Sequence, residues 1–314
     1  MVNKSENLLV EAAQLYYGEQ QTMAAIASRL GVSRPTVSRL LKAARDTGVV
    51  TIHIKEQPHR GHPLERRLAD LYRVRVQVVR PPDHATEQVR MRRVAIATAQ
   101  LVDSLMVAGT TLGVAWGSTV TEVAQYLPKR HLEGVTVVQL NGAGNASHTG
   151  IPYSGAILGQ VSAAYGAQMV HFPVPAFFDF ADTKAAMWRE RSIRGVLAVQ
   201  RKADVALFGV GAFGGAIPSH VYAGRYFDTQ QLADLRAQGI VGDVCTVMVR
   251  QDGTWADLDV NRRASGPTPA ELAKIGRRVC AAAGKHRAAA LRGALTTGAI
   301  TDLVVDVELA EQLL

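Results

Sequence analysis

The sequence predicts two structural units in one chain: an N-terminal all-α winged helix-turn-helix and a C-terminal α/β unit with a Rossmann-like parallel sheet. Residues 22–46 have the apolar spacing of a tight helical hairpin. From residue 74 onward, short apolar runs alternate with helical stretches. Between the two patterns, residues 55–63 (KEQPHRGHP) are polar, lack periodicity and contain proline and glycine. We therefore expect one domain over 1–54, a linker over 55–63 and a second domain over 64–314.

The N-terminal unit is expected to hold three helices and a strand. Residues 5–17 show helical spacing and predict the first helix. In the hairpin, Ala27 is small where the two helices come close, and Gly31 lies where the turn needs a positive φ. The segment VVTIHI (49–54) then alternates like a strand and predicts part of a small wing. The apolar side chains expected to lock the hairpin are Ile26, Leu30, Val32, Val37 and Leu40.

The second helix of the hairpin has a polar, basic outer face. Ser33 can cap its N-terminus, and Pro35 falls in its first turn. No acidic residue occurs from Ser33 to Arg45, which is typical of a helix that enters the major groove of DNA. Because these signals agree, we favour DNA binding over a solvated helical hairpin. The expected DNA contacts are Ser33, Arg34, Pro35, Thr36, Ser38, Arg39 and Lys42, with Thr36 and Arg39 reading bases and Ser38 and Lys42 touching phosphates.

Composition places the chain among ordinary globular proteins. With 314 residues, 47% of them apolar and 20% charged, the chain is long enough for two domains with packed cores. It has no run of about 18 apolar residues and no signal-peptide pattern at its start, so we expect a cytoplasmic protein without a membrane span. Cys245 and Cys280 fit neither a disulfide framework nor a zinc site, and we expect two buried free thiols.

The net charge of +8 is unevenly distributed. Residues 1–100 hold 16 Lys and Arg against 9 Asp and Glu, whereas residues 101–314 hold 19 against 18. A basic region attracts phosphates through the release of counterions. Since the excess coincides with the predicted helix-turn-helix, it favours nucleic acid as a partner over an ordinary solvated surface.

The second unit alternates strands and helices. The runs that predict strands are 74–79, 110–116, 135–140, 168–174, 204–210, 278–284 and 300–306. The helical stretches between them are 86–106, 118–127, 154–166, 229–239 and 286–298. Runs buried on both faces and separated by crossover helices indicate a parallel sheet with helices on each side. Ligands of such sheets bind at the carboxyl ends of the strands.

Two loops follow predicted strands and are candidates for ligand contact. Trp116-Gly117-Ser118-Thr119 opens a helix, where hydroxyls and free N–H groups at the positive end can hold a phosphate or another anion. An ordinary serine N-cap after a glycine turn explains the same pattern equally well. Asn141-Gly142-Ala143-Gly144-Asn145 resembles a second ligand-facing loop, and a flexible connection is again the equal alternative.

Three further features suit a polar ligand. The segment 209–214 matches GxGxxG, but no helix opens from it, so a glycine loop lining a sugar pocket is favoured over a dinucleotide site. The cations of 285–287 begin a predicted helix and could pair with a phosphate, unless they face solvent. Asp243, Asp257 and Asp259 could receive sugar hydroxyls, although surface aspartates are the commoner case.

Motifs of catalysis and metal binding do not stand out. The nine histidines are spread out without metal spacing, and neither a GxSxG elbow nor a Cys/His pair occurs. We expect no catalytic residue, no metal and no cofactor. The rival hypothesis is an isomerase-like enzyme acting on a sugar phosphate, with Asp179 or Asp243 as the base. A third hypothesis is a constitutive nucleoid or scaffold protein that binds DNA without a ligand.

With these motifs in this order, the chain resembles the SorC family of bacterial transcriptional regulators, which join a DeoR-like helix-turn-helix to a C-terminal sugar-binding domain. The segments that carry the resemblance are 12–52, GVAWGSTV (113–120), GVGAFG (209–214), VGDVCTVMVRQDG (241–253) and 260–306. The resemblance implies a C-terminal fold like that of the sugar-phosphate isomerases. It also implies a bound effector, usually a phosphorylated sugar or polyol, and a homodimer or homotetramer.

The resemblance also implies roles for single residues. Gly117, Ser118 and Thr119 match the family's segment that holds the phosphate of the effector. Arg287 stands where the family often has a lysine, and Arg262 stands where it often has an acid, which would add a cation near the pocket. The expected effector site is Gly117, Ser118, Thr119, Asn141, Gly142, Gly209, Gly211, Asp243 and Arg287. We expect a regulator, with repression as the favoured direction, of a carbohydrate catabolism operon, bound to a palindromic operator in double-stranded DNA.

Overall fold

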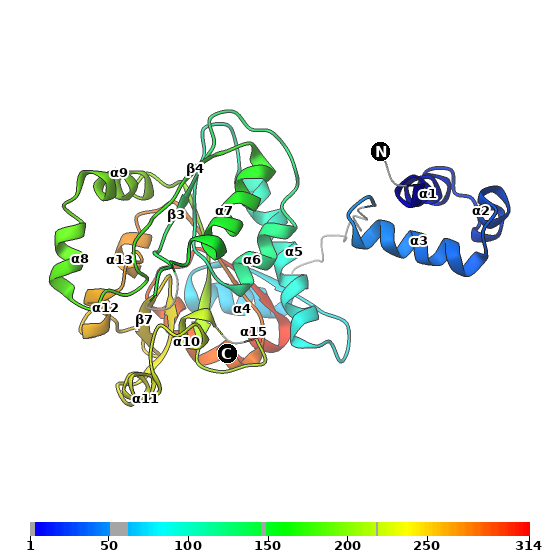
Figure 1. Cartoon of the computed structure of the whole chain (residues 1–314). Helices are drawn as coiled ribbons and strands as arrows, with labels where there is room; N and C mark the ends of the chain where they lie inside the picture. The colour runs from blue at the N-terminus through cyan, green and yellow to red at the C-terminus, as the bar shows by residue number, and fades with distance from the viewer. Residues whose placement is uncertain (1–3, 51–61, 146–148, 218) are drawn as a thin grey trace. The chain divides into compact units, whose positions relative to one another are not determined.

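The computed structural model describes residues 4–50, 62–145, 149–217 and 219–314. Between residues 59 and 60 the chain divides into two compact units, which are drawn in Figure 1. This division falls inside the segment predicted as the linker, of which residues 55–61 lie outside the described residues. No helix within the described ranges is long and apolar enough to cross a membrane.

The first unit consists, in its described part, of helices packed around one small core. Its elements are α1 (Lys4–Ala13), a π-helical turn (Gln14–Gly18), α2 (Met23–Leu30) and α3 (Arg34–Asp46). The core is made by Ala12, Leu15, Ile26, Ala27, Val37 and Leu41, with Leu30, Val32 and Leu40 packed against it while partly buried. The predicted helical hairpin is therefore confirmed. The predicted wing strand (49–54) has only Val49 and Val50 among the described residues, and the rest lies outside them.

Local chemistry explains where the helices of this hairpin begin and end. Thr22 caps α2, since its Oγ1 accepts a hydrogen bond from the N–H of Ala25 at 3.3 Å. Gly31 ends α2 with a φ of +65°, a conformation that costs glycine little. A Cβ at this position would meet nothing within 4 Å, so the backbone conformation and not the available space requires glycine. Ser33 caps α3 through the N–H of Thr36 at 3.3 Å.

The second unit is built on a parallel sheet with the strand order β1-β9-β8-β5-β2-β3-β4. Every neighbouring pair on this path is parallel. The strands are β1 (Arg75–Val79), β2 (Thr111–Val114), β3 (Thr136–Gln139), β4 (Gln168–Val170), β5 (Val205–Ala212), β8 (Arg277–Ala282) and β9 (Asp302–Asp306). Each overlaps one of the seven apolar runs expected as strands, which confirms the α/β class of this unit.

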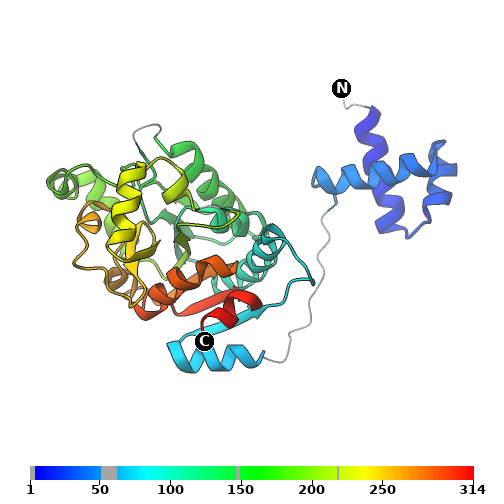
Figure 2. The same cartoon turned by 90° about the horizontal axis from the view of Figure 1, so that it is seen from below.

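Helices cover both faces of this sheet. On one face, α5 (Glu87–Leu105), α6 (Ser118–Gln125) and α7 (Ile151–Tyr165) bury their apolar sides in one core. On the other face, α4 (Pro63–Tyr72), α14 (Ala288–Thr296) and α15 (Val307–Gln312) form a second core, and Figure 2 shows α15 beside α4. The remaining helices are α8 (Ala181–Met187), α9 (Arg191–Gln200), α10 (His220–Ala223), α11 (Thr229–Ala237), α12 (Asp259–Arg263), α13 (Pro269–Leu272) and a 3-10 turn at Lys285–Arg287.

An antiparallel hairpin that sequence patterns did not predict extends from β5. It consists of β6 (Ile240–Val244) and β7 (Val247–Arg250), and β6 pairs with the end of β5 so that Asp243 lies opposite Gly211. The turn residues Cys245 and Thr246 have φ values of +50° and +72°. Two positive φ angles in a two-residue loop are the geometry of a type I′ turn, which usually takes asparagine and glycine. The unusual turn residues explain why the hairpin was missed.

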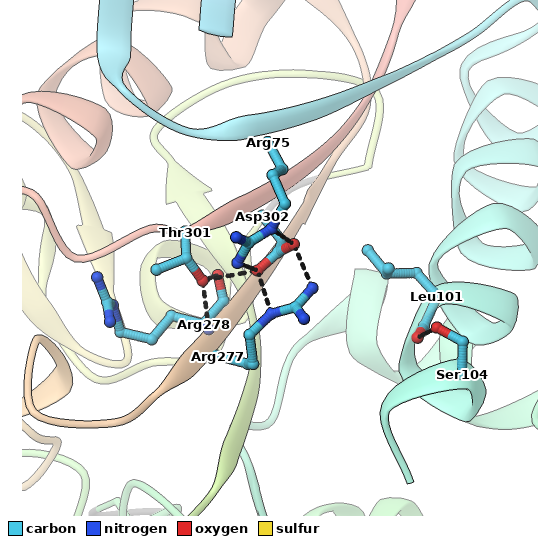
Figure 3. Close-up of polar contacts among 7 residues, drawn as sticks. All are labelled: Arg75, Leu101, Ser104, Arg277, Arg278, Thr301 and Asp302. Carbon is cyan, nitrogen blue, oxygen red and sulfur yellow. Dashed lines mark hydrogen bonds and ion pairs between the residues drawn. The ribbon is translucent and has the colours of Figure 1, made fainter.

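At the opposite, amino end of the sheet, Asp302 joins three neighbouring strands (Figure 3). Its carboxylate is 2% exposed and accepts two hydrogen bonds from Arg75 on β1, at 2.7 and 3.0 Å, and two from Arg277 on β8, at 3.0 and 2.7 Å. Thr301 donates a further bond at 2.7 Å. Burial by itself would raise the pKa of Asp302, but these hydrogen bonds together hold it well below its usual range.

Candidate functional site

In the first unit, α3 presents the residues expected to contact DNA on its outer side. Val37, Leu41 and Ala44 are buried against the rest of the unit. Of the expected contacts Ser33, Arg34, Pro35, Thr36, Ser38, Arg39 and Lys42, only Thr36 is partly buried, and the other six are exposed.

A row of hydrogen bonds runs along this outer face. The hydroxyls of Ser33 and Thr36 are 2.8 Å apart, and Arg39 donates to Thr36 Oγ1 at 3.2 Å. The guanidinium of Arg39 therefore contacts Thr36 while it stays exposed on the outer face. Such preorganisation suits a side chain that must meet a base edge in one orientation.

The charge excess of the first third of the chain belongs mostly to the second unit. Residues 1–50 hold six basic and four acidic residues, whereas residues 61–100 hold eight and four. Several of those arginines are paired: Arg90 with Glu308 at 2.6 Å and Arg92 with Glu122 at 3.7 Å. The overall charge asymmetry is thus weaker support for DNA binding than the sequence indicated, and the acid-free face of α3 is the stronger signal.

In the second unit, a cleft of about 480 Å³, its open mouth included, lies at the carboxyl ends of β2, β3 and β5. This is the edge at which parallel sheets bind ligands. Its lining is Ala115, Trp116, Gly117, Ser118, Thr119, Val120, Asn141, Gly209, Val210, Gly211, Ser219, His220, Val221, Asp243, Cys245, Thr246 and Arg287. Eight of the nine predicted effector residues are in this set, and Gly142 is the exception.

The N-terminus of α6 forms one wall of the cleft. Gly117 precedes the helix with φ +154° and ψ +160°, a conformation that side-chain-bearing residues rarely adopt. Within the described residues no side chain caps α6, and its first turn holds no acid. The first N–H groups of a helix have no partner inside the helix, so those of α6 are available to an acceptor. Thr119 is buried, and its hydroxyl donates a hydrogen bond to the sulfur of Met91 at 3.9 Å.

Two other residues of the lining, Asp243 and Asn141, each carry a buried oxygen atom without a partner among the described residues. Asp243 is 4% exposed; its Oδ2 accepts from the N–H of Thr246 at 3.0 Å, while Oδ1 has no partner among the described residues. A Cβ at Gly211 would collide with that Oδ1, which explains the glycine. Burial raises the pKa of Asp243 to about 6, and the Thr246 N–H and the nearby Tyr222 hydroxyl limit the rise. Asn141 is 1% exposed, and its Oδ1 is likewise unpartnered in the described part.

Arg287, in the 3-10 turn before α14, supplies a positive charge to the cleft. It is 2% exposed and donates to the carbonyl oxygens of Ala283 and Ile217, the latter at 3.1 Å. Its Nη1 lies 3.4 Å from Oε1 of Glu87, and its Nε has no partner among the described residues. Burial lowers the pKa of Arg287, and Glu87 opposes this effect. Of the two neighbouring basic residues, Lys285 is exposed and His286 lies against Glu87.

An aromatic group borders the same cleft. Trp116 lines it, stacks on Tyr226 with ring centres 5.6 Å apart, and donates from Nε1 to the carbonyl oxygen of Gly142 at 2.7 Å. A Cβ at Gly142 would collide with the carbonyl oxygens of Val174 and Pro175. Gly142 does not line the cleft itself, but its carbonyl oxygen holds the indole of Trp116 through that hydrogen bond.

Further polar residues that the sequence offered as possible members of the site lie outside the cleft, and for Asp257 and Asp259 the favoured alternative, a surface position, is confirmed. Asp257 and Asp259 do not line the cleft: they are exposed and pair with Arg250 at 2.8 Å and Arg262 at 3.4 Å. Because Arg262 is engaged there, it adds no cation to the cleft. Asp179, one of two candidate bases, is also exposed and outside the lining.

The sequence also missed part of the lining. Ser219, His220 and Val221 come from the short helix α10 and its start, which has no periodic signal. Cys245 and Thr246 come from the unexpected turn of the β6–β7 hairpin. Both cysteines are buried free thiols, as predicted, and burial raises the pKa of each.

This architecture has counterparts among known proteins. Residues 58–314 match the family described as "Putative sugar-binding domain", and residues 13–47 match "Sigma-70, region 4". The chain is 30% identical to a deoxyribonucleoside regulator from Bacillus subtilis (strain 168), over 100% of this chain and 99% of that protein. It is similar to a domain of a possible sugar-binding transcriptional regulator from Arthrobacter aurescens TC1 (TM-score 0.75, 40% identity, 82% of this chain and 99% of that chain). It is also similar to the full-length sorbitol operon regulator SorC from Klebsiella pneumoniae (TM-score 0.70, 26% identity, 99% of each chain).

Proposed function

Because the chain belongs to the SorC family of sugar-binding transcriptional regulators, we propose that it binds the operator of a carbohydrate catabolism operon and answers to a sugar or sugar-phosphate effector in the cleft. Repression is the direction of control that we propose. The DNA-binding domain is 1–54, the linker 55–63, and the effector and oligomerisation domain 64–314.

Operator recognition is assigned to α3. Thr36 and Arg39 read bases, and Ser38 and Lys42 contact phosphates. The first residues of the helix and its cap lie close to the DNA backbone: Ser33, Arg34 and Pro35. The hydrogen bond from Arg39 to Thr36 supports this assignment because it holds the guanidinium on the exposed face. A homodimer or homotetramer with two-fold symmetry would present two copies of α3 to a palindromic operator.

The observation that carries the effector assignment is the set of unpartnered polar atoms at the cleft. Asp243 Oδ1, Asn141 Oδ1 and Arg287 Nε are buried without hydrogen-bond partners among the described residues, and all three residues line it. A buried polar group left unpaired costs about 1–3 kcal/mol. A ligand with several hydroxyl groups can satisfy two acceptors and one donor at once, while the N-terminus of α6 receives a phosphate or another oxygen.

Control of DNA binding then follows from differential affinity. An effector changes operator occupancy only if it binds one arrangement of the oligomer more tightly than another. A ligand that fills the cleft touches the segment after β2, the end of β5 and the β6–β7 turn together, so its affinity depends on how these elements are arranged.

The test is operator binding by the full-length protein, measured by fluorescence anisotropy with and without candidate effectors. Related regulators are named for a deoxyribonucleoside and for the sorbitol operon, so the panel contains deoxyribose, sorbitol, other sugars and polyols, and the phosphate of each. We expect one member to shift the operator Kd, and the shift to be lost in Ser118→Ala or Thr119→Ala. If no member shifts it, the proposal fails.

One observation favours a second function, sugar-phosphate isomerisation. Asp243 is a buried carboxylate in the cleft with a pKa raised to about 6, which suits a general base. Turnover of ribose phosphate or glucosamine phosphate, abolished in Asp243→Asn, would favour the enzyme. Under the regulator proposal neither compound is turned over.

A further inference from the structure

Glu87 belongs to none of the motifs of this chain, yet it contacts the cation of the cleft. Its Oε1 lies 3.4 Å from Arg287 Nη1 and 3.4 Å from His286 Nδ1. Its Oε2 accepts a hydrogen bond from the N–H of Ala216 at 3.1 Å. Glu87 is also the first residue of the 19-residue helix α5, where the helix dipole stabilises a carboxylate. The side chain is therefore fixed from three directions.

This contact changes the charge that a ligand meets. Among the described residues that line the cleft, the Lys, Arg, Asp and Glu side chains are Arg287 and Asp243, which carry opposite charges; His220 adds an imidazole. Glu87 does not line the cleft but contacts Arg287, and both side chains are largely shielded from solvent, so water screens their interaction weakly. Burial, followed by the charge of Arg287, lowers the pKa of His286, so this side chain adds little positive charge near pH 7.

The hydrogen-bonding groups that remain are mixed. Arg287 Nε and the first N–H groups of α6 can donate, whereas Asp243 Oδ1 and Asn141 Oδ1 can only accept. A hydroxyl group both donates and accepts, so it can satisfy either kind. A phosphate dianion only accepts, and the side chains around it would be two carboxylates, Asp243 and Glu87, against the single guanidinium of Arg287.

We propose that Glu87 determines the charge selectivity of the cleft, so that it takes an uncharged polyhydroxyl effector in preference to the phosphate ester of the same compound. This inference rests on the proposed function, whose effector it narrows. It also explains how an arginine in this position can coexist with an effector that carries no phosphate, because Glu87 supplies a negative charge 3.4 Å from the guanidinium.

The test removes the charge of Glu87 and keeps its shape. Glu87→Gln retains an oxygen that can accept from the Ala216 N–H. The probe is inorganic phosphate, titrated into the full-length protein by calorimetry. We expect weak binding to the wild type and at least about tenfold tighter binding to Glu87→Gln, because the uncompensated guanidinium then attracts the anion. Adding Arg287→Met to Glu87→Gln should abolish the gain.

Glu308→Gln is the matched control. Glu308 pairs with Arg90 of the same helix α5 at 2.6 Å and does not line the cleft, so the substitution makes the same change in net charge elsewhere. Phosphate affinity should stay within about twofold of the wild type. A phosphate affinity of Glu87→Gln equal to that of the wild type, or an equal gain in Glu308→Gln, overturns the inference.

A second measurement on the wild type separates this inference from the proposed function. Thermal stability is compared in the presence of each compound of the panel and its monophosphate, and the uncharged member of an active pair should give the larger shift. If a compound alters operator binding but its monophosphate binds the wild-type cleft more tightly than the uncharged form, the inference is wrong and the proposed function stands. If Glu87→Gln binds phosphate more tightly than the wild type but no compound alters operator binding, the proposed function fails and the effect of Glu87 on the charge of the cleft stands.

Discussion

Replacing Asp243 by asparagine should stabilise the second unit of this protein while weakening effector binding. The pKa of Asp243 is raised from 3.8 to about 6, because burial penalises the charged form. The folded protein therefore binds this proton more tightly than the unfolded chain, and stability falls as the pH rises from 3.8 to about 6. Since a tenfold change in proton affinity corresponds to about 1.4 kcal/mol, the ionised carboxylate costs about 3 kcal/mol at pH 7.

An asparagine has no charge to bury, and its oxygen can still accept from the N–H of Thr246. We expect Asp243→Asn to raise the free energy of unfolding by about 2 kcal/mol at pH 7, somewhat less than the full electrostatic cost because the amide is also desolvated. Near pH 4 the wild-type carboxyl is protonated in the folded state, so the gain should shrink toward zero.

Urea unfolding followed by tryptophan fluorescence measures this difference directly. The chain has three tryptophans, Trp116, Trp188 and Trp255, and all lie in the second unit, so the signal reports on that unit. Asp257→Asn is the control, because Asp257 is an exposed partner of Arg250 and its replacement should give no gain. The reasoning would be refuted if Asp243→Asn were less stable than the wild type at pH 7. It would also be refuted if the difference in free energy of unfolding between variant and wild type were the same at pH 4 and pH 7.

The other predictions concern DNA binding, the amino end of the sheet and the glycine before α6. Arg39→Ala should weaken specific operator binding by about 1–3 kcal/mol, and an unchanged operator Kd would remove Arg39 from the interface. Lys42→Ala should weaken binding to all sequences alike and reduce the slope of log K against log salt by about 1, which a salt titration measures. Asp302→Asn should lower the free energy of unfolding by about 2 kcal/mol, less than for a fully buried pair because Arg75 is 62% exposed. The stabilisation by Asp302 is present above pH 3.8 and is lost as the pH falls through its depressed folded-state pKa; urea unfolding that shows no difference between variant and wild type contradicts this. Gly117→Ala should strain the backbone at φ +154° and weaken effector binding in the anisotropy assay, and an unaltered effector response would contradict that expectation.

Local features of the chain were predictable because neighbouring residues determine them. Ser33 caps α3 and Gly31 adopts a positive φ as expected, since both effects act within a few residues along the chain. The seven parallel strands followed from apolar runs, because a strand buried on both faces requires such a run wherever it lies. Gly117 and Gly211 were likewise found through the loops that end these strands.

Tertiary structure decided which of these residues meet. The sheet order β1-β9-β8-β5-β2-β3-β4 brings Arg75 to Asp302, 227 positions away, and α5 carries Glu87 to Arg287, 200 positions away. Periodicity within a helix or strand says which face is buried but not which element covers it. The turn at Cys245 adopts positive φ without the usual glycine or asparagine, because the hairpin around it is held by pairing with β5. The sequence alone indicated a polar ligand, because glycine loops and polar residues follow the predicted strands. The charge that this ligand meets depends on Glu87, which only the fold brings to Arg287.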